Sequence, residues 1–302
     1  MMSTILETIK QSYTGYFNYI LQEITNPKFE NYFYGLIIVS IAVFALELIK
    51  PWRKNQKVFR KDFFLDMFYM FFNFFLFNLM VFIAFSNTVE LLFKKLLSSV
   101  GLVISDLQLF DVDGFGVPLS LLVFFLITDF VQWCTHVILH RVPFLWNFHK
   151  VHHSVKEMGF AAHLRYHWME TLVYRTMLYL PLAFIGGFEV EEVVLVHFFA
   201  LIIGHLNHAN FKLPLGPFKY LFNSAQMHIW HHAKDLPASH KHGMNFGISL
   251  SIWDYIFNTN YIPHSGRDIE LGFHNDEDFP QDFIHQEMYP LGKSSETKHN
   301  KA

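Results

Sequence analysis

Positions 63–85 of this chain read FFLDMFYMFFNFFLFNLMVFIAF, a continuous run of apolar and mostly aromatic residues. A helix needs about 20 mainly apolar residues to cross the hydrocarbon core of a bilayer, and this stretch is long enough. A soluble protein could bury such a helix in its core, but the length and apolarity of the run favour a membrane span. Only 16% of the 302 residues are charged, against roughly 25% in soluble domains.

Other apolar stretches lie on both sides of this run. Residues 32–49 are almost entirely apolar, and residues 117–139 are apolar but contain Asp129 and His136. Residues 171–210 hold two shorter apolar segments separated by a glycine pair and acidic residues, which predicts a helical hairpin with that turn as its tip. We therefore predict an all-α integral membrane bundle with about four to five membrane-embedded helices, the hairpin included.

The loop between the first two predicted spans sets the expected orientation. Its sequence, KPWRKNQKVFRKD at positions 50–62, carries six Lys or Arg residues, and short basic loops stay on the cytoplasmic side of a membrane. Counting spans from this loop places the hairpin tip outside. Residues 149–165 and the chain after Asn210 then form a cytoplasmic cap. We expect this membrane to be a bacterial inner membrane or the endoplasmic reticulum.

Bulk properties exclude several other classes of protein. The net charge of −3 gives no reason to expect a nucleic-acid partner. A single cysteine, Cys134, excludes an internal disulfide framework. Residues 1–20 lack the basic and apolar regions of a cleavable signal peptide. The expected protein is thus a multi-pass membrane protein that keeps its N-terminal segment.

Composition also divides the chain into three predicted parts. Residues 1–115 form N-terminal membrane anchor helices, and residues 116–263 form a histidine-rich catalytic region. Residues 264–302 form a polar C-terminal tail, because they are rich in Asp, Glu and Lys. The last stretch of that tail, LGKSSETKHNKA, is expected to be disordered.

Histidine is the unusual residue of this chain, with 19 copies. One pair has H-x-x-x-H spacing, which places both rings on one helix face. Two further groups share the spacing H-x-x-H-H, in which the residues at i, i+3 and i+4 are neighbours on a helix. Such polar rings are costly near lipid unless each finds a partner, and together they offer too many ligands for one metal ion. The pattern predicts a site for two ions formed by His136, His140, His149, His152, His153, His228, His231 and His232.

Other polar residues are candidates to complete this site. His205 and His208 lie at the cytoplasmic end of the predicted hairpin, and His163 and His167 lie in the cap. Glu170, three residues after His167, could accept the second N–H of a ligand imidazole. An ion pair of Glu170 with Arg165 or Arg175 is an equally good interpretation. The isolated histidines are expected not to be ligands, namely His197, His264, His274, His285 and His299.

The ligand type narrows the choice of metal. Imidazole suits zinc, copper, iron and nickel, whereas structural zinc normally fills its shell with cysteine, of which this chain has one. A pair site built from nitrogen ligands with spare positions suits iron that must bind O2. Composition alone leaves zinc and copper open, and zinc could occupy the site as a non-native ion.

The order of these motifs resembles the fatty acid hydroxylase and sterol desaturase superfamily of membrane di-iron enzymes, over roughly residues 62–263. The segment RYHWMETL resembles the family's R-x-H-P-x-E, with Trp168 in the proline's place, and HANFKLPLGP and NFGISLSIWDYIFNT also resemble family segments. Gly204 stands where some relatives have a further histidine, which makes His205 less certain, and Met227 replaces another. Carried over by position, the resemblance implies as ligands the eight histidines named above together with His208, with His205 and His167 less certain.

The resemblance implies an O2-dependent oxidoreductase of the monooxygenase type that acts on a membrane lipid. Hydroxylation, desaturation and ether cleavage of a sterol, fatty acyl or ether lipid all stay open. Electrons must come from a separate cytochrome b5-type protein, ferredoxin or reductase, because the chain has no nucleotide-binding fingerprint. Two other functions compete: a histidine-rich membrane metal transporter or binding protein without redox catalysis, and a haem-binding cytochrome in which His136 and His197 face each other.

Overall fold

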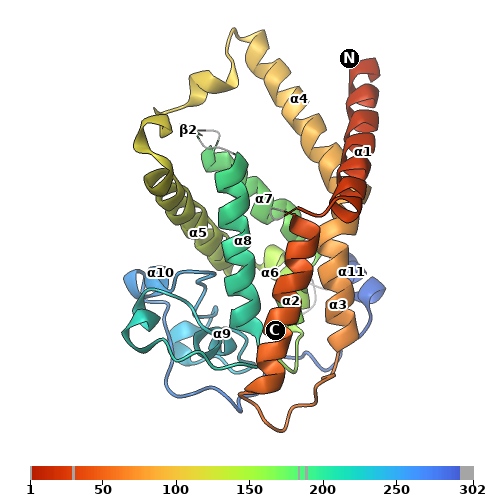
Figure 1. Cartoon of the computed structure of the whole chain (residues 1–302). Coiled ribbons are helices and arrows are strands. Elements are labelled where there is room, and N and C mark those ends of the chain that lie inside the picture. Colours follow the sequence, from red (N-terminus) through yellow and green to blue (C-terminus); the bar gives the residue numbers. More distant parts are fainter. Residues whose placement is uncertain (1, 29–30, 183, 188–189, 293–302) are drawn as a thin grey trace, which may run out of the picture.

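The computed structural model describes residues 2–28, 31–182, 184–187 and 190–292. Over these residues the chain is mostly helical, and the predicted all-α fold is confirmed (Figure 1). The α-helices are α1 (Met2–Thr25), α2 (Tyr32–Ile49), α3 (Phe63–Phe71), α4 (Ile83–Ser99), α5 (Val117–Arg141), α6 (Pro143–His153), α7 (Trp168–Leu182), α8 (Val190–His208), α9 (Ala225–His231), α10 (Ile252–Ile256) and α11 (Phe283–Gly292).

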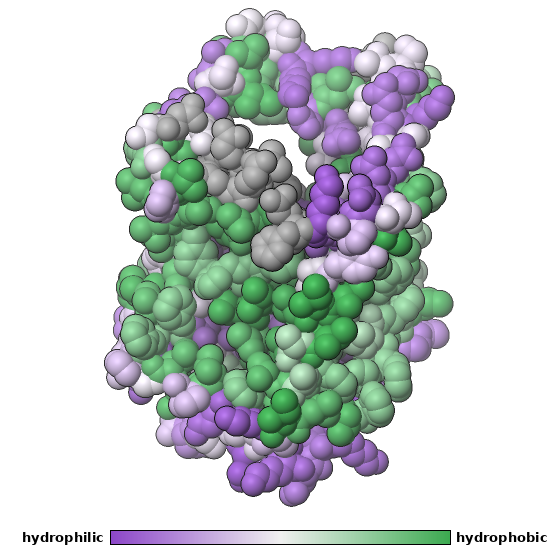
Figure 2. All heavy atoms as spheres, in the orientation of Figure 1, coloured by the Kyte–Doolittle hydropathy of each residue, from purple (hydrophilic) through white to green (hydrophobic). Residues whose placement is uncertain are grey.

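Within the described residues, three helical segments are long and apolar enough to cross a membrane: residues 32–49, residues 63–99 and residues 117–141. The exposed side chains on these helices include Ile41, of which 64% is accessible, and Phe64, of which 72% is accessible. In Figure 2 hydrophobic residues cover the middle of the visible face, and hydrophilic residues gather at its two ends. An apolar belt of this kind is characteristic of an integral membrane protein.

The second span is longer than the stretch that the sequence singled out, and it is irregular in the middle. Two π-helical turns, η1 (Phe72–Leu76) and η2 (Asn78–Phe82), join α3 to α4. Such turns add a residue to the helical ladder and often occur at functional sites. Here Asn73 donates from its buried amide to the carbonyls of Leu164 and Tyr166, at 2.9 and 2.8 Å. The π turns thus hold the segment that follows α6.

The predicted hairpin is formed by α7 and α8. Between them lies β2 (Ile185–Gly186), which pairs in parallel with β1 (Phe110–Asp111). In Figure 1 this turn lies at one end of α8, and α9 lies at the other end. The hairpin therefore connects the cap with the opposite end of the molecule.

The cap combines α6, the segment that follows it up to Arg165, the chain after Asn210 and the basic loop at positions 50–62. Short 3-10 turns connect its helices: η5 (Phe160–Leu164), η6 (Gly216–Tyr220) and η7 (Ala238–His240). Met158, Ile229 and Met244 are among the buried residues of its apolar core. The basic loop packs on this core, because Arg53 donates to the Met158 carbonyl at 3.0 Å.

Two parts of the chain differ from what the sequence suggested. Helix α1 was not among the predicted elements, and it packs on α4, with Asn87 donating to Ser12 Oγ at 2.9 Å. Residues 264–292 pack on the cap through the buried side chains of Phe273 and Phe279. Most of the stretch expected to be disordered, residues 293–302, lies outside the described residues.

Candidate metal centre

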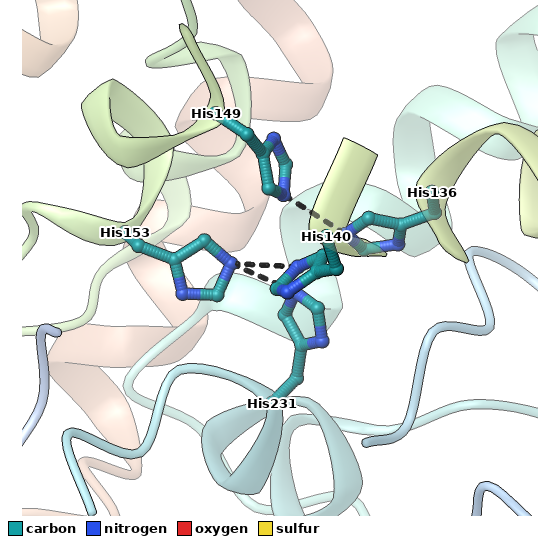
Figure 3. A group of neighbouring side chains, drawn as sticks. All are labelled: His136, His140, His149, His153 and His231. Atoms are coloured by element: carbon teal, nitrogen blue, oxygen red, sulfur yellow. Dashed lines mark hydrogen bonds between the residues drawn. The ribbon is translucent and has the colours of Figure 1, made fainter. Parts of the chain in front are cut away.

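Nine buried or half-buried histidines converge between α5, α6, α8 and α9, in two groups whose ligand atoms lie within 4.8 Å of one another. They are the nine histidines that the sequence and the resemblance singled out. The first cluster is His136, His140, His149, His153 and His231 (Figure 3). The second cluster is His152, His208, His228 and His232.

Each H-x-x-H-H motif is divided between the two clusters. On α6, His149 and His153 belong to the first cluster and His152 to the second. At the end of α9 the division is reversed: His231 joins the first cluster, while His228 and His232 join the second. Residues at i and i+4 point in similar directions on a helix, and i+3 lies to one side. Each short helix therefore supplies ligands to both clusters and holds them next to each other.

In both clusters the Nε2 atoms point inward. In the first cluster Nε2 of His136 lies 3.2 Å from Nε2 of His149, and His153 lies 3.1 Å from His140 and 3.0 Å from His231. In the second cluster the corresponding contacts are 3.3 Å between His152 and His208, 3.0 Å between His208 and His228, and 3.1 Å between His228 and His232.

The outward-facing Nδ1 atoms determine the tautomers of several rings. A backbone carbonyl can only accept, so an Nδ1 that contacts one must carry the proton, and its Nε2 is then a bare lone pair. His152 donates to the Arg165 carbonyl at 3.0 Å, and His208 donates to the Gly204 carbonyl at 2.8 Å. His136 and His231 donate likewise to Phe246 and Met244, both at 2.8 Å.

With these tautomers, the Nε2 atoms of His152 and His208 are both acceptors, and they lie 3.3 Å apart. Two lone pairs at that distance repel each other unless a cation lies between them. Two nitrogens bound to one ion at about 2.1 Å would be separated by about 3.0–3.4 Å, which agrees with the Nε2 separations of both clusters. The residues therefore fit two metal ions, as the resemblance implies.

Glu170 supports the first cluster from outside. Its Oε2 lies 2.7 Å from Nδ1 of His149, and both groups are buried. Arg165, one of the two arginines that could have paired with Glu170, contacts Asp66 at 3.0 Å instead. A carboxylate behind a ligand imidazole fixes the ring and raises its basicity. Sequence alone left this partner open because it could not place Asp66 beside Arg165.

The carbonyls that orient His136 and His231 belong to the loop before α10, which two buried carboxylates hold. Asp254 accepts from Trp133 of α5 at 3.0 Å, and also from the amides of Phe246 and Gly247. Asp129 of α5 accepts from the amide of Ser249 at 2.9 Å. The sequence showed Asp129 within an apolar stretch and Asp254 within NFGISLSIWDYIFNT, but it did not predict this role. The only signal for it was two acidic residues within apolar stretches.

Burial keeps the cap histidines of the site neutral. It lowers the pKa of His152 to about 3. Burial likewise lowers the pKa of His231 and of His232 well below the usual value, and charged neighbouring rings would lower them further. Neutral imidazole is the form that binds metal. The rings are thus ready to bind an ion at neutral pH.

His205 and His167, the two less certain candidates, lie outside both clusters. His205 contacts His163 at 2.9 Å and Ser40 at 3.2 Å. His167 donates from Nε2 to the Glu287 carbonyl at 2.7 Å. A Cβ on Gly204 would lie 2.1 Å from Nε2 of His163, so the glycine makes room for that ring.

A cavity of about 460 Å³ reaches the clusters from the membrane helices. Rings of both clusters line it, including His136, His149, His152, His208 and His228. Aromatic and aliphatic side chains of α1, η1 and α8 line much of the rest, among them Tyr16, Phe74 and Leu201. An elongated, mainly apolar molecule in this cavity could touch both clusters at once.

Comparisons with known proteins agree with this site. Residues 121–259 match the model of the fatty acid hydroxylase family. Relatives include the ornithine lipid hydroxylase OlsE of Rhizobium tropici (29% identical, over 48% of this chain and 43% of the relative) and the alkylglycerol monooxygenase of Homo sapiens (31%, over 45% and 29%). A third is the very-long-chain aldehyde decarbonylase GL1-10 of Oryza sativa subsp. japonica (26%, over 47% and 46%).

The matched segment spans less than half the length of each of these relatives. No solved structure matches the chain. The resemblance found in the sequence is thus confirmed for the region that carries both histidine clusters.

Proposed function

We propose that this chain, which carries a fatty acid hydroxylase region at residues 121–259, is a membrane oxidoreductase that uses two iron ions and O2 to hydroxylate or desaturate a lipid. The observation that carries the proposal is the pair of histidine clusters, above all the two acceptors that face each other at His152 and His208. The names of the relatives support a lipid substrate, since one refers to an ornithine lipid and another to alkylglycerol.

The donor set supports iron but also suits other metals. All nine candidate ligands are imidazoles, a ligand type that iron shares with zinc and copper. Two ions bound in adjacent clusters would supply the activation of O2 that oxidation of a C–H bond requires. Zinc could take the same places as a non-native occupant without supplying that chemistry.

The chain's own residues then bind and orient the substrate and keep water away. The cavity would hold a lipid chain along α1, η1 and α8, so that one carbon lies beside the rings of both clusters. Glu170 keeps His149 turned toward the centre by holding its Nδ1 at 2.7 Å. Buried aromatic residues of the cap, such as Phe246 and Phe148, exclude solvent from the rings.

The fold also supports a cytoplasmic position for the site. The basic loop at positions 50–62 packs on the cap, with Lys61 donating from its amide to Glu157 at 2.7 Å. A basic loop stays on the cytoplasmic side, so we place the whole cap there. A soluble or membrane-bound electron donor, such as a cytochrome b5-type protein, ferredoxin or reductase, would then reach the cap from the cytoplasm. We also retain residues 116–263 as the catalytic region and residues 1–115 as anchor helices.

A histidine-rich metal transporter is the alternative. Transport needs ligands along a path through the spans, whereas the nine histidines gather in two adjacent clusters at one end of the helices. Metal flux into proteoliposomes that contain the purified protein would support this alternative.

The test is an anaerobic purification in detergent followed by reconstitution with ferrous iron. We expect about two irons per chain, and O2-dependent products in extracted membrane lipids, measured by metal analysis and mass spectrometry. His152→Ala should lose the iron of the second cluster and form no product, while the protein stays in the membrane. His285→Ala, an exposed residue paired with Asp282, is the matched control. Less than about one iron per chain and no product would overturn the proposal.

A further inference from the structure

The cavity is also lined by a group of polar residues outside the histidine clusters. They are Tyr16, Tyr19 and Glu23 of α1, Arg175 of α7 and His197 of α8. Arg175 lies five residues beyond Glu170 on α7, which corresponds to about 7.5 Å of helix rise. Glu170 in turn contacts His149 of the first cluster. The guanidinium of Arg175 and rings of both histidine clusters therefore line the same cavity.

Among the described side chains, Arg175 has no anionic partner. In the described part of the chain no carboxylate oxygen lies within the 4.0 Å that defines an ion pair. Its guanidinium instead stacks over the ring of Phe82, 4.2 Å from the ring centroid. It also interacts electrostatically with Tyr16, Tyr166 and His197. A charged residue among membrane helices is costly and normally has a partner.

Among the described residues, this polar group has one carboxylate, Glu23, which already has hydrogen-bond donors. Glu23 accepts from the amide of Phe33 at 3.4 Å and interacts with the hydroxyl of Tyr19. The ring of Phe82 offers Arg175 a π face but no oxygen acceptor. The described lining therefore supplies no anion that pairs with Arg175.

We infer that Arg175 binds the anionic group of an amphiphilic lipid, a carboxylate or a phosphate monoester, whose chain extends along the cavity to the histidine clusters. The planar guanidinium can donate two parallel hydrogen bonds to either group. Its position on α7 would bring carbons near the anionic group, and not the far end of the chain, beside the clusters. This inference rests on the proposed lipid substrate and names its chemical class.

A purely structural role for Arg175 is the competing explanation. In that case its stacking on Phe82 would only join α7 to the π-helical turns of the second span. Phe82→Leu removes the stacking but leaves the charge, and Arg175→Lys keeps a charge without the planar fork. Arg175→Gln removes the charge. Arg267→Gln, a change at an exposed residue of the cap, is the matched control.

The experiment measures binding of radiolabelled hexadecanoate to metal-free protein in a maltoside detergent at pH 8, with hexadecyl phosphate and hexadecanol as competitors. We expect an anionic probe to bind the wild-type protein at least about tenfold more tightly than the alcohol, as a charge-assisted hydrogen bond predicts. Arg175→Gln should abolish that preference and leave binding of hexadecanol unchanged, and Arg175→Lys should keep part of it. Phe82→Leu and Arg267→Gln should keep all of it.

Equal binding of acid, phosphate and alcohol by the wild-type protein would overturn the inference without any variant having to fold. An undiminished preference in Arg175→Gln would do the same. Of the two anionic probes, the one that binds more tightly identifies a carboxylate or a phosphate as the natural group. Because the assay needs neither iron nor O2, anion binding without oxidation would count against the proposed function alone, and oxidation without anion preference against this inference alone.

Discussion

The two histidine clusters share the helices α6 and α9 but are held from outside in different ways. In the first cluster, His149 has the carboxylate of Glu170 behind it, and His136 and His231 have backbone carbonyls. The second cluster has only neutral carbonyls, behind His152 and His208. The Nδ1 atoms of its other two rings, His228 and His232, are buried and have no hydrogen-bond partner among the described residues.

This difference suggests that the two ions would not be equivalent. A carboxylate behind an imidazole strengthens that ligand and fixes its ring, whereas no outer hydrogen bond orients the rings of His228 and His232. We expect the first cluster to bind its ion more tightly. The second cluster would have the more adaptable ligands.

The largest effects should follow from removing one ligand of each cluster at neighbouring positions. His231→Ala opens the first cluster and His232→Ala opens the second. Each variant should lose its own ion and all activity, because the proposed reaction needs both ions. Iron analysis and product detection would check this. Two irons retained by either variant would contradict the division of the H-x-x-H-H motif.

A smaller and more selective effect is expected from Glu170→Gln. Loss of the charge behind His149 should weaken binding at the first cluster by about 10–100-fold and leave the second unchanged. The measurement is a metal titration of the variant against the wild-type protein. Glu277→Gln, which changes a surface carboxylate paired with Lys234, is the matched control. Equal weakening of both clusters would remove the distinction between them.

Acid should affect the two clusters together. Burial lowers the pKa of His152 to about 3 in the folded protein, whereas an unfolded histidine has a pKa of about 6.5. Between these values the unfolded chain binds more protons than the native chain, so the free energy of unfolding falls as the pH falls below about 6.5. Thermal unfolding of metal-free protein at pH 7.5, 6.5 and 5.5 should show a steadily lower midpoint. In loaded protein, both ions should leave when the fold is lost. Release of one ion from folded protein near pH 6 would contradict this prediction.

The smallest effect is expected at a histidine that belongs to neither cluster. His285 is exposed and lies 2.8 Å from Asp282 at i−3, an arrangement that contributes little to stability. His285→Ala should change the free energy of unfolding by less than about 0.5 kcal/mol and leave metal content and activity unchanged. A loss of iron in this variant would mean that the two clusters are not the whole site.

Much of the fold and most of the site could be predicted because both depend on local patterns. The apolar run at residues 32–49 agrees with α2 at both ends, and the spacings of the histidine motifs identified residues that do meet. The division of each motif between two clusters could not be predicted, since it depends on how α6 and α9 face each other. The partner of Glu170 could not be predicted for the same reason. Arg165 pairs with Asp66, which lies far away in the chain, and Glu170 contacts His149 instead.

The hydrogen bonds that support the site could not be predicted from local sequence patterns either. Asn73 lies in a π turn, from which it contacts the segment after α6. No sequence motif predicts such a turn. Asp129 looked like an isolated charge in a span, but its partners lie about 120 residues further along the chain. Contacts of that range come from the tertiary structure, which a single sequence does not reveal.

The first cluster takes two rings from the membrane helix α5 and the others from the cap. The ions that we propose for the chemistry would therefore also clamp the cap to the bilayer-spanning half. The metal-loaded protein would then be more stable than the metal-free protein, because metal-binding free energy counts as folding free energy. Iron starvation should accordingly lower the amount of this protein through proteolysis, and not leave a full complement of idle enzyme in the membrane.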